Sequence, residues 1–383
     1  MNPSPGQGDL DMTTQPTKFH EAARWVAGLL LSMATTCFTL PAAAQDWKQD
    51  WDRTVAVAKK EGRIVISAPS GRVWRDALDL EWKKTYPEIE LKMTPAASRE
   101  FWPRIVKEQE VGQNLWDLRV GGPDNLSYNL KRQGYIQPLR HMLVLPEILG
   151  DEKWYGGMDG LFLDKEKVHF LGFVMHDQTI AYYNKKYVSN PNGLDFKDLV
   201  DPQWKGKISM ADPRGGSPLT GASVLLKTYG EDFVRKLYRD QQPVVSKEPR
   251  LQMQWMVSGR YPVAFGIPTA AWVDYAARGV SVDDFVKIKG TYSWSQGVGG
   301  IQLIKGAPNP NASKVFINWI LTEPVQSALM KAAELNSRRK GIPSGDPDGM
   351  IDVDNLDQYV GGQTEEMRDY QDRMATLFSE LLP

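Results

Sequence analysis

The chain of 383 residues is 42% hydrophobic and 24% charged, and its net charge at pH 7 is −1. A charge this close to zero argues against nucleic acid or an anionic membrane as the main partner, because both favour a basic surface. At this length a single hydrophobic core is not expected to suffice, so a fold with two lobes is the default expectation.

The first 44 residues have the pattern of an export signal. Lys18 and Arg24 precede an apolar run over 25–40, and three alanines follow it at 42–44. A basic start, a short apolar segment and an Ala-x-Ala end are typical of a secretory signal peptide. The run spans about 16 residues, fewer than the roughly 20 that cross a membrane, so an uncleaved anchor is the less favoured alternative. We therefore expect cleavage after Ala44 and a periplasmic mature protein.

Removal of this leader changes the composition. Cys37, the only cysteine, lies inside the apolar run, so the mature chain would have no disulfide, thiolate metal site or cysteine nucleophile. A lipoprotein would instead keep Cys37 as its acylated first residue, but Thr36 before it is a poor neighbour for that processing. The leader also carries two basic and three acidic residues, so the mature chain would have a net charge of zero.

From residue 46 onward, helical and strand-like patterns alternate. Helices are predicted over 51–61, 74–86, 100–111 and 124–132, and strands over 63–67, 89–93 and 115–120. The pattern resumes with strands over 179–183, 207–210 and 261–265 and a helix over 270–277. Strands alternating with helices at this spacing indicate βαβ units and mostly parallel sheets.

Two sets of strand-to-helix loops follow from these elements. The first set is 67–72, 95–99 and 121–124, and the second is 212–218 and 266–269. In open α/β sheets, ligands bind beyond the carboxyl ends of the strands, at such loops. Two facing sets predict two lobes with a cleft between them. Free N–H groups at helix starts suit a carboxylate, phosphate or sulfonate ligand.

Several segments in a fixed order resemble a known family. They are GYIQPL at 134–139, IAYYNKKYV at 180–188, FKDL at 196–199, PQWKGKI at 202–208, DPR at 212–214, KGAPNP at 305–310 and FINWIL at 316–321. Together they make the chain similar to the family 1 extracellular solute-binding proteins, particularly the branch of ferric-iron and related periplasmic receptors. The segment over 309–321 also has the apolar stripe of a core helix.

The resemblance implies an α/β, two-lobed periplasmic-binding-protein fold of type II, with two mixed sheets flanked by helices and a double-strand hinge. It implies delivery of a small-molecule ligand to the inner-membrane permease of an ATP-binding-cassette importer. The segment over 180–188 is expected to be the crossover strand. We expect lobe one to comprise 45–175 and 297–342, lobe two 176–296, and a C-terminal helical segment, 343–383, to pack across both lobes.

One departure from the ferric-iron receptors concerns the ligand. The resemblance implies adjacent tyrosines in the loop after the strand at 261–265, whereas that loop here reads GIPTAAW at 266–272. Tyr182 and Tyr183 do not replace them, because successive side chains of a strand point to opposite faces. Ferric iron requires hard anionic oxygen donors. We therefore expect a small organic, anionic solute and keep a ferric-iron receptor as an alternative.

The candidate ligand-binding residues lie in or beside the predicted loops and crossovers. They are Ser70, Arg72, Ser98, Arg99, Gly122, Asp177, Asp212, Arg214, Ser217, Thr269, Trp272 and Trp294. Arg214 is the expected anion clamp of lobe two, with Arg72 or Arg99 opposite, because a guanidinium binds an oxyanion with two directed hydrogen bonds. Trp272 and Trp294 are expected to stack on the ligand. The alternative is a surface ion pair for each arginine and simple packing for each tryptophan.

The sequence gives little support for catalysis or a resident metal. Ser217 lies in GGSPL, which lacks the last glycine of a nucleophile elbow. His141, His169 and His176 fall in no catalytic or metal motif, and the acidic turn over 344–355 lacks the glutamate of a calcium loop. We therefore expect a monomeric receptor without catalytic residues, metal or cofactor. A periplasmic enzyme and a sensor partner that presents ligand to a membrane regulator are the rival hypotheses.

Overall fold

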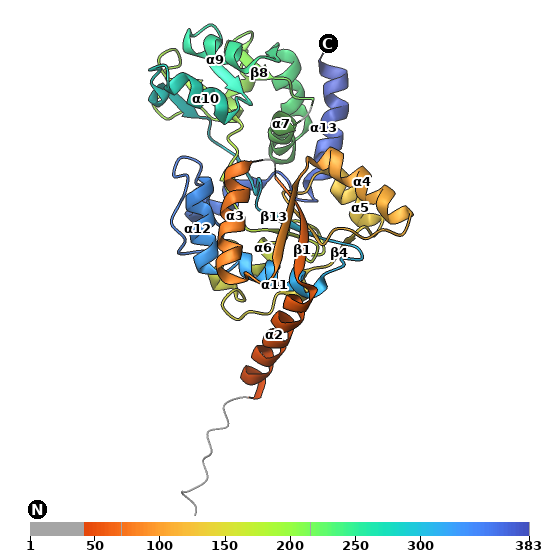
Figure 1. Cartoon of the computed structure of the whole chain (residues 1–383). Helices are drawn as coiled ribbons and strands as arrows, with labels where there is room; N and C mark the ends of the chain where they lie inside the picture. The colour runs from red at the N-terminus through yellow and green to blue at the C-terminus, as the bar shows by residue number, and fades with distance from the viewer. Residues whose placement is uncertain (1–41, 70, 215, 383) are drawn as a thin grey trace, which may run out of the picture. The chain divides into compact units, whose positions relative to one another are not determined.

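The computed structural model describes residues 42–69, 71–214 and 216–382. The predicted signal peptide, residues 1–44, lies almost entirely outside the described residues, and its cleavage stays a prediction. Within the described ranges, no helix combines the length and hydropathy that crossing a membrane requires. These ranges form an α/β structure with three β-sheets (Figure 1).

The first sheet contains the strands predicted from the N-terminal part of the chain. Its path is β2 (Glu90–Pro95), β1 (Arg63–Ala68), β3 (Leu118–Val120), β13 (Gly300–Ile304) and β4 (Ile136–Gln137), and β5 (Phe170–Gly172) also pairs with β13. β1 is parallel to β2 and β3, as βαβ units require. β13 arrives from much later in the sequence and runs antiparallel to its neighbours, so the sheet is mixed.

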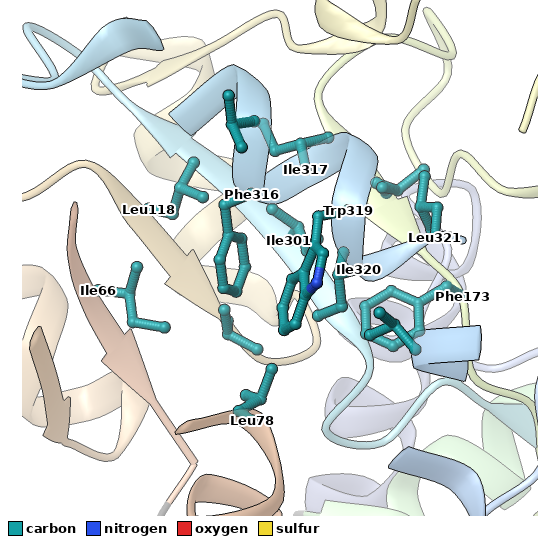
Figure 2. Close-up of a cluster of buried hydrophobic side chains, with 14 of the residues drawn as sticks. Ile66, Leu78, Leu118, Phe173, Ile301, Phe316, Ile317, Trp319, Ile320 and Leu321 are labelled. Atoms are coloured by element: carbon teal, nitrogen blue, oxygen red, sulfur yellow. The ribbon is translucent and has the colours of Figure 1, made fainter. Parts of the chain in front are cut away.

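Helices on both faces bury this sheet. They are α2 (Ala42–Glu61), α3 (Arg72–Thr85), α4 (Ser98–Glu110), α5 (Asn125–Arg132), α6 (Gly157–Gly160), α11 (Pro310–Ile320) and α12 (Glu323–Ala333). Figure 2 shows Ile66 and Leu118 of the sheet gathered around Phe316 and Trp319 of α11. The indole of Trp82 on α3 meets that of Trp319 edge to face, with centroids 4.9 Å apart. The predicted core role of the helix over 309–321 is therefore confirmed.

The second sheet is formed by the middle of the chain. Its order is β11 (Phe285–Lys287), β7 (Ala181–Asn184), β10 (Val263–Phe265), β8 (Ile208–Ala211) and β9 (Val244–Ser246). Its helices are α7 (Gly216–Tyr229), α8 (Glu231–Arg235), α9 (Pro249–Val257), α10 (Thr269–Ala276) and the C-terminal α13 (Met367–Leu381). α13 lies beside α7 (Figure 1) and buries Met374, Leu377 and Phe378 in the core of this sheet. This sheet too is mixed, because β10 is parallel to β8 and antiparallel to β7.

A third, small sheet joins the other two. It contains β6 (His176–Asp177), β12 (Tyr292–Ser295) and β14 (Tyr359–Gly361). The chain passes from the first sheet to the second through β6 and returns through β12, and these two crossing strands pair antiparallel. Short 3-10 or π turns complete the described elements at Arg140–Met142, Asp151–Lys153, Phe196–Val200, Pro202–Trp204, Lys236–Asp240, Val282–Asp284 and Val353–Gln358.

The expected crossover strand over 180–188 is corrected by this topology. Within it, β7 lies inside the second sheet, paired with β10 and β11, and the crossing strand is β6. Tyr183 is buried and Tyr182 is only partly buried, as expected for successive residues of a strand with one buried face. A two-residue strand such as β6 is too short to show a periodic pattern in the sequence. It is recognised only by its pairing with β12 in the structure.

Asp164, in the loop before β5, leads to a prediction about acid stability. Its buried carboxylate accepts hydrogen bonds from the backbone N–H groups of Val168, His169 and Phe170, at 3.0–3.1 Å, and contacts the His169 ring at 3.1 Å. Burial raises the pKa of Asp164, but these hydrogen bonds outweigh it, and the pKa lies below its usual value.

Because the folded pKa is lowered, the stabilisation from Asp164 is present above the unfolded pKa of about 4 and lost as pH falls through the folded pKa. We expect Asp164→Asn to unfold at lower urea than wild type at pH 5, with a difference that narrows steadily below pH 4. Asp348→Asn, at an exposed position, is the control. A difference that stays constant across this range would contradict the prediction.

Candidate functional site

A cavity of about 570 Å³, the main cavity, lies beside the crossing strand β6. Its lining comes mainly from the segment 176–182, from the loops that follow β8 and β10, and from the first turns of α7. β8 and β10 are parallel, so their carboxyl ends open at the same edge of the second sheet. That edge is where α/β sheets bind ligands.

An aromatic wall bounds the main cavity. Tyr182 and Trp272 both line it, and their ring centroids are 4.6 Å apart. Trp272 also packs on Phe285, with centroids 5.0 Å apart, which holds the indole in place. The indole Nε1 of Trp272 is buried and donates to no described residue. A ligand acceptor at this N–H would therefore gain a hydrogen bond that the described protein groups do not provide.

Gln178 adds a second unpaired polar group to the main cavity. Its Nε2 donates to Ser217 Oγ at 3.1 Å, whereas its Oε1 is buried and accepts from no described residue. Ile180 and Phe265 contribute apolar surface around these polar groups. Among the described residues, the cavity therefore combines an unpaired donor and an unpaired acceptor with apolar walls, which is the usual composition of a small-molecule site.

Asp177 lines the main cavity, but its charge is already balanced. Thr179 Oγ1 donates to one carboxylate oxygen at 3.0 Å, and Lys287 Nζ forms an ion pair with the other. Burial alone would lower the pKa of Lys287. The charge of Asp177 raises this pKa by a larger amount, so the pKa of Lys287 lies above its usual value. Lys287 is therefore charged at neutral pH, and its ion pair with Asp177 ties the second sheet to the crossing strand β6.

A second cavity, of about 510 Å³, adjoins the first at the start of α7. It shares Gln178 and Ser217 with the main cavity. Its other lining residues come from both sides of the crossing strands, with Asp124 and Tyr128 from the α5 region and Gln363 from the C-terminal segment. Asp124 caps α5 by accepting from the Ser127 N–H at 2.9 Å, which places the helix start at this cavity.

Some candidates from the sequence are brought together here. Asp177, Ser217 and Trp272 line the main cavity, and Arg99 and Ser217 line the second. Gly122 packs against the β12–β13 turn, where its N–H donates to Gly297 O at 3.1 Å and an added Cβ would lie 2.9 Å from that oxygen. Gly297 itself lines the main cavity, so Gly122 lies just behind the cavity wall.

Other candidates are placed elsewhere. Arg214 is half exposed and binds Asp212 bidentately, with Nε at 2.8 Å and Nη2 at 3.0 Å, and neither lines the two cavities. The exposed Arg72 pairs with Asp76 at 3.1 Å. Trp294 lines a separate cavity of about 190 Å³, where the guanidinium of Arg338 lies over its ring.

The remaining candidates are only partly described. Ser98 is the first residue of α4, and its buried Oγ makes no hydrogen bond with a described residue. Thr269 begins α10, but its side chain is not among the described ones. Ser70 lies outside the described residues.

Sequence reasoning did not select Tyr182 and Gln178 as site residues. The signal for Tyr182 was present, because strand alternation opposite a buried Tyr183 places it on the other face, toward the cavity. Gln178 had no such signal, since it follows a two-residue strand whose pairing cannot be inferred locally.

A metal site is weakly supported among the described residues. Asp164, Glu166 and His169 are close enough to share an ion. Both carboxylate oxygens of Asp164 already accept hydrogen bonds, and Glu166 is paired with Lys131. This cluster therefore resembles a hydrogen-bonded loop more than a set of free ligands.

Comparison with known proteins agrees with this architecture. A family described as bacterial extracellular solute-binding protein matches residues 77–348. A Haemophilus influenzae protein described as uncharacterized is 22% identical over 330 residues, covering 81% of this chain and 89% of its own.

Two solved structures show the same fold. Ferric iron-binding protein A of Mannheimia haemolytica, in an open conformation, has a TM-score of 0.62 at 13% identity, covering 84% of this chain and 98% of its own. AfuA of Actinobacillus pleuropneumoniae, with fructose-6-phosphate bound, has a TM-score of 0.56 at 17% identity, with coverage of 84% and 98%. These neighbours are two-lobed periplasmic binding proteins, so the predicted two-lobed fold with two mixed sheets and a double-strand hinge is confirmed.

The family match spans most of the chain, from α3, a helix that packs on the first sheet, to the segment after α12. It includes both crossing strands and the loops that line the main cavity. The resemblance inferred from short segments of the sequence is thereby confirmed, and the chain belongs to the bacterial extracellular solute-binding protein family.

Proposed function

We propose that this protein captures a small organic solute with an anionic group and delivers it to the permease of an ATP-binding-cassette importer. The observation that carries the proposal is the main cavity at the hinge, with its aromatic wall and its unpaired donor and acceptor. Its volume of about 570 Å³ is within the range of about 300–1,000 Å³ that small-molecule sites occupy.

An anionic group is supported by the start of α7. Gly216, Ser217 and Thr220 of its first turns line the second cavity, and Ser217 also lines the main one. The first N–H groups of a helix have no partner within it and carry partial positive charge, so they favour an oxyanion. AfuA, a protein of the same fold, holds a sugar phosphate.

Closure of the lobes around the solute would be the signal that the permease reads. We propose that lobe one comprises 45–175 and 297–342 and lobe two 176–296, with 343–383 bridging them. In support, Tyr128 donates to Gln363 O at 2.7 Å on one side, and Arg373 binds Glu231 at 2.7 Å on the other. These contacts, one to the α5 region beside the first sheet and one to α8 beside the second, support a bridging role for 343–383.

The direct test is native mass spectrometry of protein purified from its own periplasm. We expect a co-purifying organic molecule that carries a carboxylate, phosphate or sulfonate and is released on mild unfolding. A preparation that holds no solute and binds none from a periplasmic extract would contradict the proposal. Turnover of a bound molecule would favour the enzyme hypothesis instead, and a neighbouring sensor-kinase gene in place of a permease gene would favour the sensor hypothesis.

Ferric iron is the second candidate cargo, because a structural neighbour is a ferric iron-binding protein and because His176, Asp177 and Tyr182 line the main cavity. Against it, Asp177 is already paired with Lys287, and the loop 266–272 contains no tyrosine.

We expect ferric citrate to produce no visible phenolate-to-iron absorption band and no iron that survives dialysis. The control is Tyr182→Phe, which removes the one phenol that lines the cavity from the β7 strand. A band present in the wild type and lost in this variant would make ferric iron the cargo.

We also propose that the mature protein begins after Ala44 and acts in the periplasm as a monomer. The extracellular family supports the location, and the alanines at 42–44 after the apolar run support the cleavage point.

A further inference from the structure

A row of buried polar residues crosses the first sheet on its α4 face. Ser67 of β1 is in register with Arg119 of β3, and Arg119 with Gln302 of β13. Register partners point to the same face of a sheet, so these three side chains lie together. Their strand neighbours Ile66 and Leu118 point to the opposite face, into the core that Figure 2 shows.

Arg119 in this row has an unusual environment. Its side chain is only 6% exposed and lies over the rings of Phe101 and Trp102 on α4, 5.4 and 5.9 Å from their centroids. Nη1 donates weakly, to Ser67 Oγ at 3.2 Å and Ala96 O at 3.4 Å. Nε is buried and donates to no described residue, and among described residues no carboxylate forms an ion pair with this guanidinium.

A comparison with Arg338 shows what a structural buried arginine looks like in this chain. Arg338 is 7% exposed, and its two terminal nitrogens donate to the carbonyls of Gly160 and Tyr155. The hydrogen bonds of Arg119, at 3.2 and 3.4 Å, are longer than those of Arg338. Burying a guanidinium without an opposite charge or good acceptors is costly, so such a group is retained for a reason other than folding. Burial lowers the pKa of Arg119, and Asp124 offsets this only in part.

Further unpaired polar groups lie in the segments next to Arg119 and its contacts. An added Cβ on Gly121 would be 3.5 Å from Arg119 Nη2, and one on Gly122 would be 3.0 Å from Gln296 Nε2. Both amide atoms of the fully buried Gln296 make no hydrogen bond with a described residue, and Ser98 Oγ is in the same state. This cluster lies at the carboxyl ends of β1, β2 and β3, the edge at which lobe one would meet a ligand.

We propose that Arg119 binds the anionic group of the solute in lobe one, through the edge of the guanidinium formed by Nε and Nη2. A carboxylate, phosphate or sulfonate presents two oxygens at the spacing that this edge matches, and would supply the missing opposite charge. Gly121, where an added Cβ would lie 3.5 Å from Nη2, leaves this nitrogen approachable, and the adjacent Gly122 packs against the turn whose Gly297 lines the main cavity. The inference rests on the proposed function, because it assigns the anion-binding group of the same solute.

The test is thermal unfolding of wild type and Arg119→Gln in chloride, in millimolar inorganic phosphate and in millimolar sulfate, at constant ionic strength. Wild type is expected to unfold at a higher temperature in phosphate or sulfate than in chloride, because an anion that binds only the folded state stabilises it. Arg119→Gln is expected to lose this increase. In chloride it is expected to unfold at the same temperature as wild type or higher, because a buried uncompensated charge is gone.

Two further variants make the outcome decisive. Arg119→Lys keeps the charge without the planar fork, and a reduced anion response is expected. Arg239→Gln, an exposed arginine paired with Asp240, is the control for general salt effects and should respond as wild type does. A wild type that shows no response overturns the inference. So does an Arg119→Gln variant that is several degrees less stable in chloride, or fails to fold, because Arg119 would then be structural.

The solute itself separates this inference from the proposed function. If the co-purifying molecule is bound but carries no anionic group, the receptor function stands and the role of Arg119 is refuted. If no solute is found while the anion response depends on Arg119, the anion site stands and the receptor function is in doubt.

Discussion

Replacing Trp272 with alanine is expected to weaken binding of the co-purified solute by about tenfold to a hundredfold. The indole bounds the main cavity and is held by Tyr182 and Phe285, so its removal leaves the solute against water instead of an apolar surface. Burial of a large apolar side chain contributes about 1.5–3 kcal/mol, and each 1.4 kcal/mol corresponds to a factor of ten in affinity. Isothermal titration calorimetry with the solute measures the change.

A smaller substitution separates the two contributions of Trp272. Trp272→Phe keeps an aromatic ring but removes the buried Nε1–H, which is unpaired among the described residues. A neutral hydrogen bond contributes about 0.5–1.5 kcal/mol, so we expect a loss of about two- to tenfold. Trp255→Phe, outside the cavity lining, should bind as wild type does. Unchanged affinity in a folded Trp272→Ala variant would show that the solute binds elsewhere.

The parts of the fold that were predicted from sequence are those with a repeated local pattern. The strand over 63–67 corresponds to β1 and the stripe of Trp74, Leu78 and Trp82 to α3, because apolar periodicity directly records which face is buried. The crossover was misplaced because β6 is two residues long and is defined by pairing with the distant β12. Long-range pairing of short strands leaves no local pattern to read.

The residues of the candidate site could also be predicted only in part from the sequence. Loops found from the sequence do lead to cavity residues such as Ser217 and Trp272. The arginines selected beside those loops lie at or just before helix starts. A side chain in such a position can point to solvent, as Arg72 does with its partner Asp76. Arg119 lies within a strand, between the buried Leu118 and Val120. A charge inside an apolar strand is the sequence signal that points to such a buried side chain.

Replacing Asp117 with alanine is expected to lower the free energy of unfolding by about 3–5 kcal/mol. Its fully buried carboxylate accepts hydrogen bonds from Val65 N–H at 2.8 Å, from Asn309 N–H at 2.7 Å and from the Asn309 side chain at 2.9 Å. Each buried donor left without an acceptor costs about 1–3 kcal/mol. Urea denaturation followed by circular dichroism measures the change, and Asp348→Ala, at an exposed position, should differ from wild type by less than about 0.5 kcal/mol.

The same substitution connects stability with the site. Asp117 ties β3 to β1 and to the start of α11, and Arg119 follows two residues later on β3. Burial raises the pKa of Asp117 despite these hydrogen bonds, so we expect the hydrogen bonds, more than the charge, to stabilise the strand. Asp117→Asn, which keeps one accepting oxygen, should therefore lose only part of the stability. If Asp117→Asn is as unstable as Asp117→Ala, the charge matters more than the bonds. If neither is destabilised, β3 is held in place by its sheet neighbours alone.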